Sequence, residues 1–123
     1  MQPLDVVIAA RDPQSATDLA VSLTRHFRSV SVAGSMEEVR HAIPKLRARL
    51  AVVDLELASL SEVRALCLEF DSTAVVCTHR IPDEEMWASA LAAGAIDCCQ
   101  HGDVAGIVAA VRSFRQDPHP SAA

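Results

Sequence analysis

The feature that most constrains the fold of this chain is the regular alternation of short apolar runs with segments of helical periodicity. The apolar runs are rich in Val, Ala, Leu and Ile and have the length of β-strands. Each is followed by a segment in which apolar residues recur at helical spacing. We expect strands at residues 5–10, 30–33, 50–54, 74–78 and 96–100. Such alternation is typical of βαβ units, whose strands form a parallel sheet.

Capping signals mark where the intervening helices begin. Asp12 followed by Pro13 is typical of a helix start, and residues 35–38 and 59–62 each have the pattern of a capping box. Pro44 should kink or end the second helix. The apolar residues expected on the buried faces of the helices are Ala16, Leu19, Ala20, Leu23, Phe27, Val39, Ala42, Ile43, Leu46, Val63, Leu66, Cys67, Phe70, Trp87, Ala90, Leu91, Val104, Ile107, Val108 and Val111.

The third apolar run indicates the architecture. Residues 50–54 are apolar until Asp54, which is typical of a strand in the middle of a sheet. Because right-handed crossovers place helices on both faces, we expect an α/β fold, a three-layer doubly wound five-stranded parallel sheet. Such folds bind ligands at the carboxyl ends of their strands. The polar residues expected at those ends are Arg11, Asp12, Asp54, Thr78, His79 and His101.

Length and charge limit what the chain does. Its 123 residues, half of them apolar, form one domain, which we place at residues 1–116, with a disordered tail at 117–123. A net charge of −5 with scattered arginines argues against direct nucleic-acid binding. The sequence shows neither a signal-peptide pattern nor the roughly 18 apolar residues that span a membrane. We therefore expect a cytoplasmic protein without membrane contact.

Three segments together resemble the response-regulator receiver family. Residues 50–55 are similar to the family's acceptor strand, residues 75–78 to the strand that ends in a hydroxyl residue, and residues 90–97 to its Ala-Leu-x-Ala-Gly-Ala-x-Asp turn. The resemblance covers almost the whole chain. It implies the strand order 2-1-3-4-5, Asp54 as the phospho-acceptor or its relic, Thr78 as the site hydroxyl, and a histidine kinase as an upstream partner.

The loop after the first strand departs from the family pattern. Where the family has two adjacent acids that hold Mg²⁺, this chain has Ala10 and Arg11, followed by Asp12. Aspartyl phosphorylation depends on a divalent ion that neutralises charge. We therefore expect Mg²⁺ to bind only weakly, through Asp12 and Asp54, or not at all. Arg11 is a candidate substitute charge, since a guanidinium can pair with the carboxylate of Asp54.

The last strand departs as well. His101 stands at the position of the family's lysine, and Cys98 at that of its aromatic switch residue, so the charge that would hold a phosphoryl group is weakened. Cysteines and histidines at the ends of strands four and five, notably Cys77 and His101, leave open a soft-metal or thiol site. Their spacing matches no zinc signature, and cysteines in apolar segments usually pack as small hydrophobic residues.

Three functional hypotheses follow. The first is a receiver-type module of a two-component or phosphorelay pathway with a degenerate phosphorylation site, acting by protein-protein interaction. It would not be an enzyme beyond weak autophosphorylation and autophosphatase chemistry at Asp54. The second is a conventional receiver that accepts phosphate on Asp54. The third is a small binding domain with a metal or thiol site near Cys77 and His101.

Small side chains on two helices indicate a contact surface. Ala92 and Ala93 of the fourth helix, and Ala105 and Ala109 of the fifth, stand where a solvated helix usually carries charge, with Arg112 at the rim. The resemblance implies partner binding through helix four, strand five and helix five. We expect a homodimer or a partner protein to bind this face.

Overall fold

The computed structural model describes residues 2–116, so the tail predicted at 117–123 lies outside the described residues. Strands and helices alternate strictly, as predicted. The strands are β1 Gln2–Ala9, β2 Phe27–Ala33, β3 Leu50–Asp54, β4 Ala74–His79 and β5 Asp97–Gln100. The helices are α1 Pro13–Leu23, α2 Met36–Leu46, α3 Leu60–Glu69, α4 Glu84–Ala93 and α5 Val104–Gln116.

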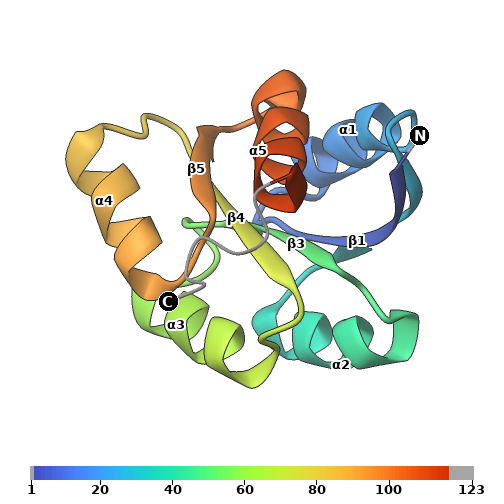
Figure 1. Cartoon of the computed structure of the whole chain (residues 1–123), viewed down its shortest axis with the longest axis horizontal. Coiled ribbons are helices and arrows are strands. Elements are labelled where there is room, and N and C mark those ends of the chain that lie inside the picture. The colour runs from blue at the N-terminus through green and yellow to red at the C-terminus, as the bar shows by residue number, and fades with distance from the viewer. Residues whose placement is uncertain (1, 117–123) are drawn as a thin grey trace.

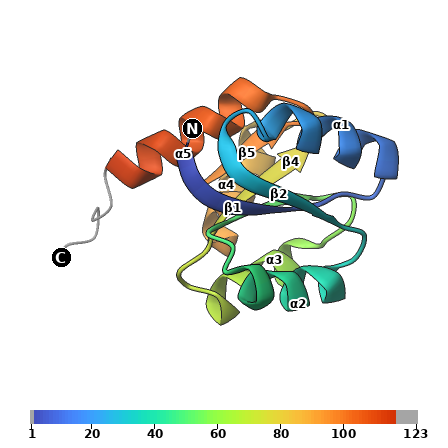
Figure 2. The same ribbon diagram turned by 90° about the vertical axis from the view of Figure 1, so that its right-hand side faces the viewer.

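The strands form one parallel sheet in the order β2-β1-β3-β4-β5. Helices α1 and α5 cover one face, and α2, α3 and α4 cover the other (Figures 1 and 2). The three-layer doubly wound architecture is therefore confirmed. Every residue of the central strand β3 is buried, including Asp54. Among the helices of residues 2–116, none is long and apolar enough to cross a membrane.

Alternate side chains of the strands build two separate cores. Val7, Val53 and Cys77 pack under α2, α3 and α4, whereas Ile8 and Val76 pack under α1 and α5. This division follows from the pleat, which points successive side chains of a strand to opposite faces of the sheet. A carboxylate at the end of β3 is therefore carried by a rigid, doubly covered strand.

Two boundaries differ from those predicted. Phe27, expected on the first helix, opens β2 instead, where it pairs with Gln2 and is fully buried. This pairing also makes β1 longer than expected. Helix α2 continues past Pro44 to Leu46, since a proline in the last turn removes only one amide donor. Arg47, which has a φ of 52°, caps the end of this helix.

The two predicted capping boxes differ in how fully they form. At the start of α3 the side chain of Ser59 accepts from the amide of Glu62, and the carboxylate of Glu62 accepts from the amide of Ser59. At the start of α2 the side chain of Ser35 accepts from the amide of Glu38, but the carboxylate of Glu38 accepts from Gly34 instead. The first box is confirmed and the second is half formed.

Three apolar side chains differ in burial from what the helical pattern predicted. Trp87, predicted in the core, is 46% exposed, and its Nε1 donates a hydrogen bond of 2.9 Å to Oδ1 of Asp97. Ala93 is buried rather than outward, and Leu46 is exposed rather than inward. In α4 the difference comes from side-chain size. Small residues such as Ala90 and Ala93 allow the helix to pack closely, whereas the indole of Trp87 needs more room and a hydrogen-bond partner.

Gly94 allows α3 and α4 to approach closely. It ends α4 with a φ of 114°, and its amide bonds to the carbonyls of Ala90 and Leu91. A Cβ atom at this position would lie 2.9 Å from Cβ of Cys67 on α3. Any side chain at position 94 therefore meets both backbone strain and a steric clash.

We expect Gly94→Ala to destabilise the protein more than Gly102→Ala. Gly102 also has a positive φ of 77°, but a Cβ there would meet nothing within 4 Å. Backbone strain costs about 1–2 kcal/mol at either site, and the clash with Cys67 adds to it only at position 94. Urea denaturation of both variants measures the difference, and equal losses in free energy of unfolding would contradict the close approach.

Candidate functional site

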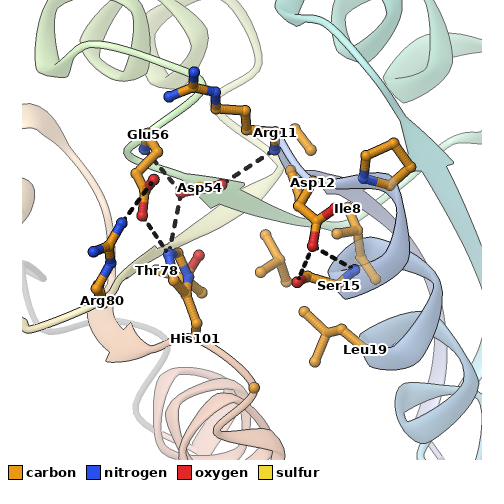
Figure 3. A pocket seen from close by; sticks show the side chains of 15 residues that line it. Ile8, Arg11, Asp12, Ser15, Leu19, Asp54, Glu56, Thr78, Arg80 and His101 are labelled. Atoms are coloured by element: carbon orange, nitrogen blue, oxygen red, sulfur yellow. Dashed lines mark hydrogen bonds and ion pairs between the residues drawn. The ribbon is translucent and has the colours of Figure 1, made fainter.

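The carboxyl edge of the sheet encloses a cavity of about 530 Å³. Residues that follow β1, β3, β4 and β5 line it, as Figure 3 shows. The predicted site residues that it brings together are Arg11, Asp12, Asp54, Thr78 and His101. The topology therefore assembles, in one place, side chains that lie far apart in the sequence.

Asp54 lies at the centre of this site and is only 6% exposed. Its Oδ1 accepts a hydrogen bond of 2.8 Å from the amide of Glu56, and its Oδ2 one of 3.1 Å from the amide of Arg11. Nε2 of His101 lies 3.5 Å from Oδ1. A buried carboxylate needs such partners, and here backbone amides from two loops fix its orientation.

Arg11 contacts Asp54 through its backbone rather than its guanidinium. The side chain extends away from the carboxylate in Figure 3. Among the ion pairs of residues 2–116, none joins the Arg11 guanidinium to Asp54. The expectation that the Arg11 side chain pairs with Asp54 is therefore wrong in its geometry, because the chain direction after β1 aims the amide, not the side chain, at the carboxylate.

Glu56 occupies the site beside Asp54. Its Oε1 lies 3.2 Å from Nε2 of His101, and its Oε2 lies 3.6 Å from Nη2 of Arg80. The hydrogen bond with His101 holds the pKa of the Glu56 carboxyl below its usual range, helped by the charges of Arg80, His101 and Arg11. Glu56 is thus contacted by His101 through one carboxylate oxygen and by Arg80 through the other.

Asp12 lines the cavity, but its carboxylate caps α1. It accepts hydrogen bonds from the hydroxyl of Ser15 at 2.7 Å and from the amides of Ser15 and Gln14. The Ser15 hydroxyl is the main cause of the lowered pKa of Asp12. Within residues 2–116 the group of ligand atoms close enough to share one metal ion comprises Asp54, Glu56 and His101, without Asp12.

Thr78 lies on the strand next to β3. It is the register partner of Asp54, it is buried, and it lines the same cavity. The amide of Leu55 donates to its carbonyl at 2.9 Å, which ties the loop after β3 to β4. The structure therefore places this hydroxyl residue where the strand ends predict it.

The cysteines belong to the two cores. Cys77 and Cys98 are register partners and pack under α2, α3 and α4, whereas Cys99 packs under α1 and α5. Burial raises the pKa of Cys77 and of Cys99 to about 12, and it raises the pKa of Cys98 as well. Within the described range no cysteine joins His101 in a group of three or more possible metal ligands, so a soft-metal site with Cys77 is not assembled.

Comparisons by sequence give no match, neither to a family model nor to a curated protein. Solved structures do match in fold. The isolated REC domain of RcsB from Salmonella enterica serovar Typhimurium, in the presence of phosphomimetic BeF₃⁻, has a TM-score of 0.78 at 15% identity, covering 91% of this chain and 90% of that chain. A response regulator from Thermotoga maritima has a TM-score of 0.80 at 19% identity, covering 94% and 99%.

The receiver domain of the Francisella response regulator 1452 is similar to the same degree, with a TM-score of 0.79 at 16% identity, covering 94% of this chain and 98% of that chain. The chain has the receiver fold. Against the longer RcsB response regulator of Salmonella typhimurium, it spans 62% of that chain. The strand order and the placement of Asp54 at the end of β3 agree with this fold.

Sequence reasoning did not assign Glu56 and Arg80 to the site of this receiver fold. Both stand one or two residues past the end of a strand, Glu56 after β3 and Arg80 after β4. After the third and fourth strands the predicted residues reached no further than Asp54 and His79, although after the first and fifth they included Arg11, Asp12 and His101. Extending the same rule by two residues would have included both charges, because the loops after parallel strands converge at one edge.

The residues of the predicted contact surface do not lie together in the structure. Ala105, Ala109 and Arg112 line a cavity together with His26, which precedes β2, so they lie on the side of α5 that faces α1. Ala92 of α4 lines a different cavity, together with Ile96 and Phe114. The prediction that Ala92 of α4 shares one face with these residues of α5 is therefore wrong. The sequence does not show which of the two exposed sides of α5 lies next to α4.

Proposed function

We propose that this chain is a receiver-type signalling module whose phosphorylation site is degenerate and which acts by binding another protein. The receiver fold supports the signalling class. The environment of Asp54 supports the degeneracy, since two backbone amides and His101 engage the carboxylate. Asp12, the acid in the loop after β1, caps α1.

The donors around Asp54 suit Mg²⁺ poorly. Mg²⁺ prefers an octahedron of oxygen ligands and retains several waters. The neighbours of Asp54 are instead the imidazole of His101 and the carboxylate of Glu56, and this carboxylate also contacts Arg80. Phosphoryl transfer to a carboxylate depends on such an ion to neutralise charge. We therefore propose that Mg²⁺ binds weakly or not at all, and that the module is not an enzyme.

Mg²⁺ together with beryllofluoride should leave the protein nearly unchanged. In an amide NMR titration we expect no saturable shifts for the residues around Asp54. The reason is that Ala10 and Arg11 stand at the two positions where acids would bind the ion. The Asp54→Asn variant is the control for shifts that do not arise from this site. Saturable shifts at millimolar Mg²⁺ that vanish in Asp54→Asn would favour the conventional phospho-accepting receiver instead.

We place the partner surface of this module on α4, β5 and α5, because an aromatic residue of α4 and one of α5 are exposed. Trp87 of α4 is 46% exposed and Phe114 of α5 is 45% exposed, and β5 is an edge strand. Exposed aromatic side chains are typical anchors of protein interfaces. Ala92 lies in the same region as Phe114 and leaves room for close approach. A second copy of the chain is the occupant we propose, in a two-fold symmetric pair.

Replacing Trp87 or Phe114 by alanine should weaken self-association by about 30-fold or more, as is typical of interface hot spots. Analytical sedimentation across a dilution series measures the dissociation of the dimer. In the unaltered chain and in Phe114→Ala, the fluorescence of Trp87, the single tryptophan, also reports it. The matched control is Ala109→Glu, which adds a charge on the α1 side of α5. Association abolished by Ala109→Glu but kept in both aromatic variants would place the interface on the α1 side and contradict the proposal.

A further inference from the structure

Asp54, Glu56 and His101 form a cluster whose chemistry differs from that of a magnesium site. Nε2 of His101 lies 3.2 Å from Oε1 of Glu56 and 3.5 Å from Oδ1 of Asp54. One ligand atom from each of the three residues lies within 4.8 Å of the others. Asp54 ends β3, Glu56 lies in the loop after it and His101 directly follows β5, and all three line one cavity.

These spacings match the edges of a metal coordination shell. Nitrogen and oxygen ligands lie about 2.0–2.2 Å from a divalent ion such as Zn²⁺, so two neighbouring ligands are about 3.0–3.6 Å apart in an octahedral or tetrahedral arrangement. The two distances from His101 fall in this range. An ion bound to all three residues would keep these two distances and draw together the carboxylate oxygens of Asp54 and Glu56, which lie within 4.8 Å of each other.

The ligand types select the class of metal. Imidazole nitrogen suits Zn²⁺, Co²⁺ and their first-row neighbours, whereas Mg²⁺ and Ca²⁺ favour sites built from oxygen. Two carboxylates would balance the charge of one divalent ion. The donor set thus resembles the mixed nitrogen and oxygen sites that leave positions open for water or a further ligand.

The surroundings hold these ligands in place. The amide of Glu56 donates to Oδ1 of Asp54, and the amide of Arg11 donates to Oδ2. Arg80 contacts Oε2 of Glu56 and leaves Oε1 directed at His101 (Figure 3). Such contacts behind a ligand orient it and strengthen metal binding.

We propose that this cluster is a binding site for one first-row divalent transition ion, with Zn²⁺ as its natural occupant, held by Oδ1 of Asp54, Oε1 of Glu56 and Nε2 of His101. The site takes the place that Mg²⁺ has in the family that the chain resembles, with a different donor set and a different metal class. It does not depend on whether the chain signals through a partner protein.

Calorimetric titration of the untagged chain with Zn²⁺, and absorption titration with Co²⁺, test the site. We expect one ion per chain, visible Co²⁺ bands without sulfur-to-cobalt charge transfer, and affinity for Mg²⁺ at least about 100-fold lower. Both His101→Ala and the isosteric Glu56→Gln should weaken Zn²⁺ binding by about 100-fold or more, while circular dichroism shows the fold unchanged.

His79→Ala is the matched control, because His79 also stands at a strand end but lies outside the ligand cluster. Its affinity for Zn²⁺ should equal that of the unaltered chain. Absence of stoichiometric binding, or an unchanged affinity in both His101→Ala and Glu56→Gln, would overturn the proposal. So would thiolate charge-transfer bands, which would move the ion to a cysteine.

Discussion

A carboxylate buried at the end of the central strand is the constraint on which the rest of the site depends. β3 is covered on both faces, so Asp54 cannot be solvated as a surface acid would be. An unpartnered buried carboxylate is unfavourable by several kcal/mol. The amides of Arg11 and Glu56 and the ring of His101 meet this need. In doing so they draw the loops after β1, β3 and β5 to one point.

The same constraint explains why the charges of the site are redistributed rather than lost. With Asp12 used as the cap of α1, the carboxylate beside Asp54 comes from Glu56, on the same loop. His101 lies between these two carboxylates, and Arg80 lies on the far side of Glu56. Nitrogen groups of His101 and Arg80 thus flank the carboxylates at this edge of the sheet, which agrees with the proposal of a module that signals by contact and not by phosphorylation.

The fold could be predicted from the sequence almost entirely, and the site only in part. Periodicity and capping residues predicted the alternation of elements, and the apolar run that ends in Asp54 is typical of a central strand. Asp54 and Thr78 were found because strand ends are visible in the sequence. The direction of a side chain is not visible, so the sequence did not show that Arg11 faces Asp54 with its amide.

The helices show the same limit. Helical spacing places Trp87 on the same side of α4 as Ala90, but it does not say which edge of that side an indole can enter. In the structure the indole of Trp87 is exposed and donates a hydrogen bond to Asp97 of β5. The small residues of α5 and those of α4 line different cavities. These outcomes depend on how neighbouring helices pack, which is a property of tertiary structure and not of local pattern.

The central claim is that altered charges around an intact receiver frame prevent phosphorylation of Asp54. Intact-mass spectrometry after incubation with Mg²⁺ and acetyl phosphate tests it on the unaltered chain and on a variant carrying Ala10→Asp, Arg11→Asp and His101→Lys. We predict that the variant gains one phosphoryl group, that a further Asp54→Asn change abolishes the gain, and that the unaltered chain gains none. Phosphorylation of the unaltered chain on Asp54 as fast as that of the variant would contradict the account.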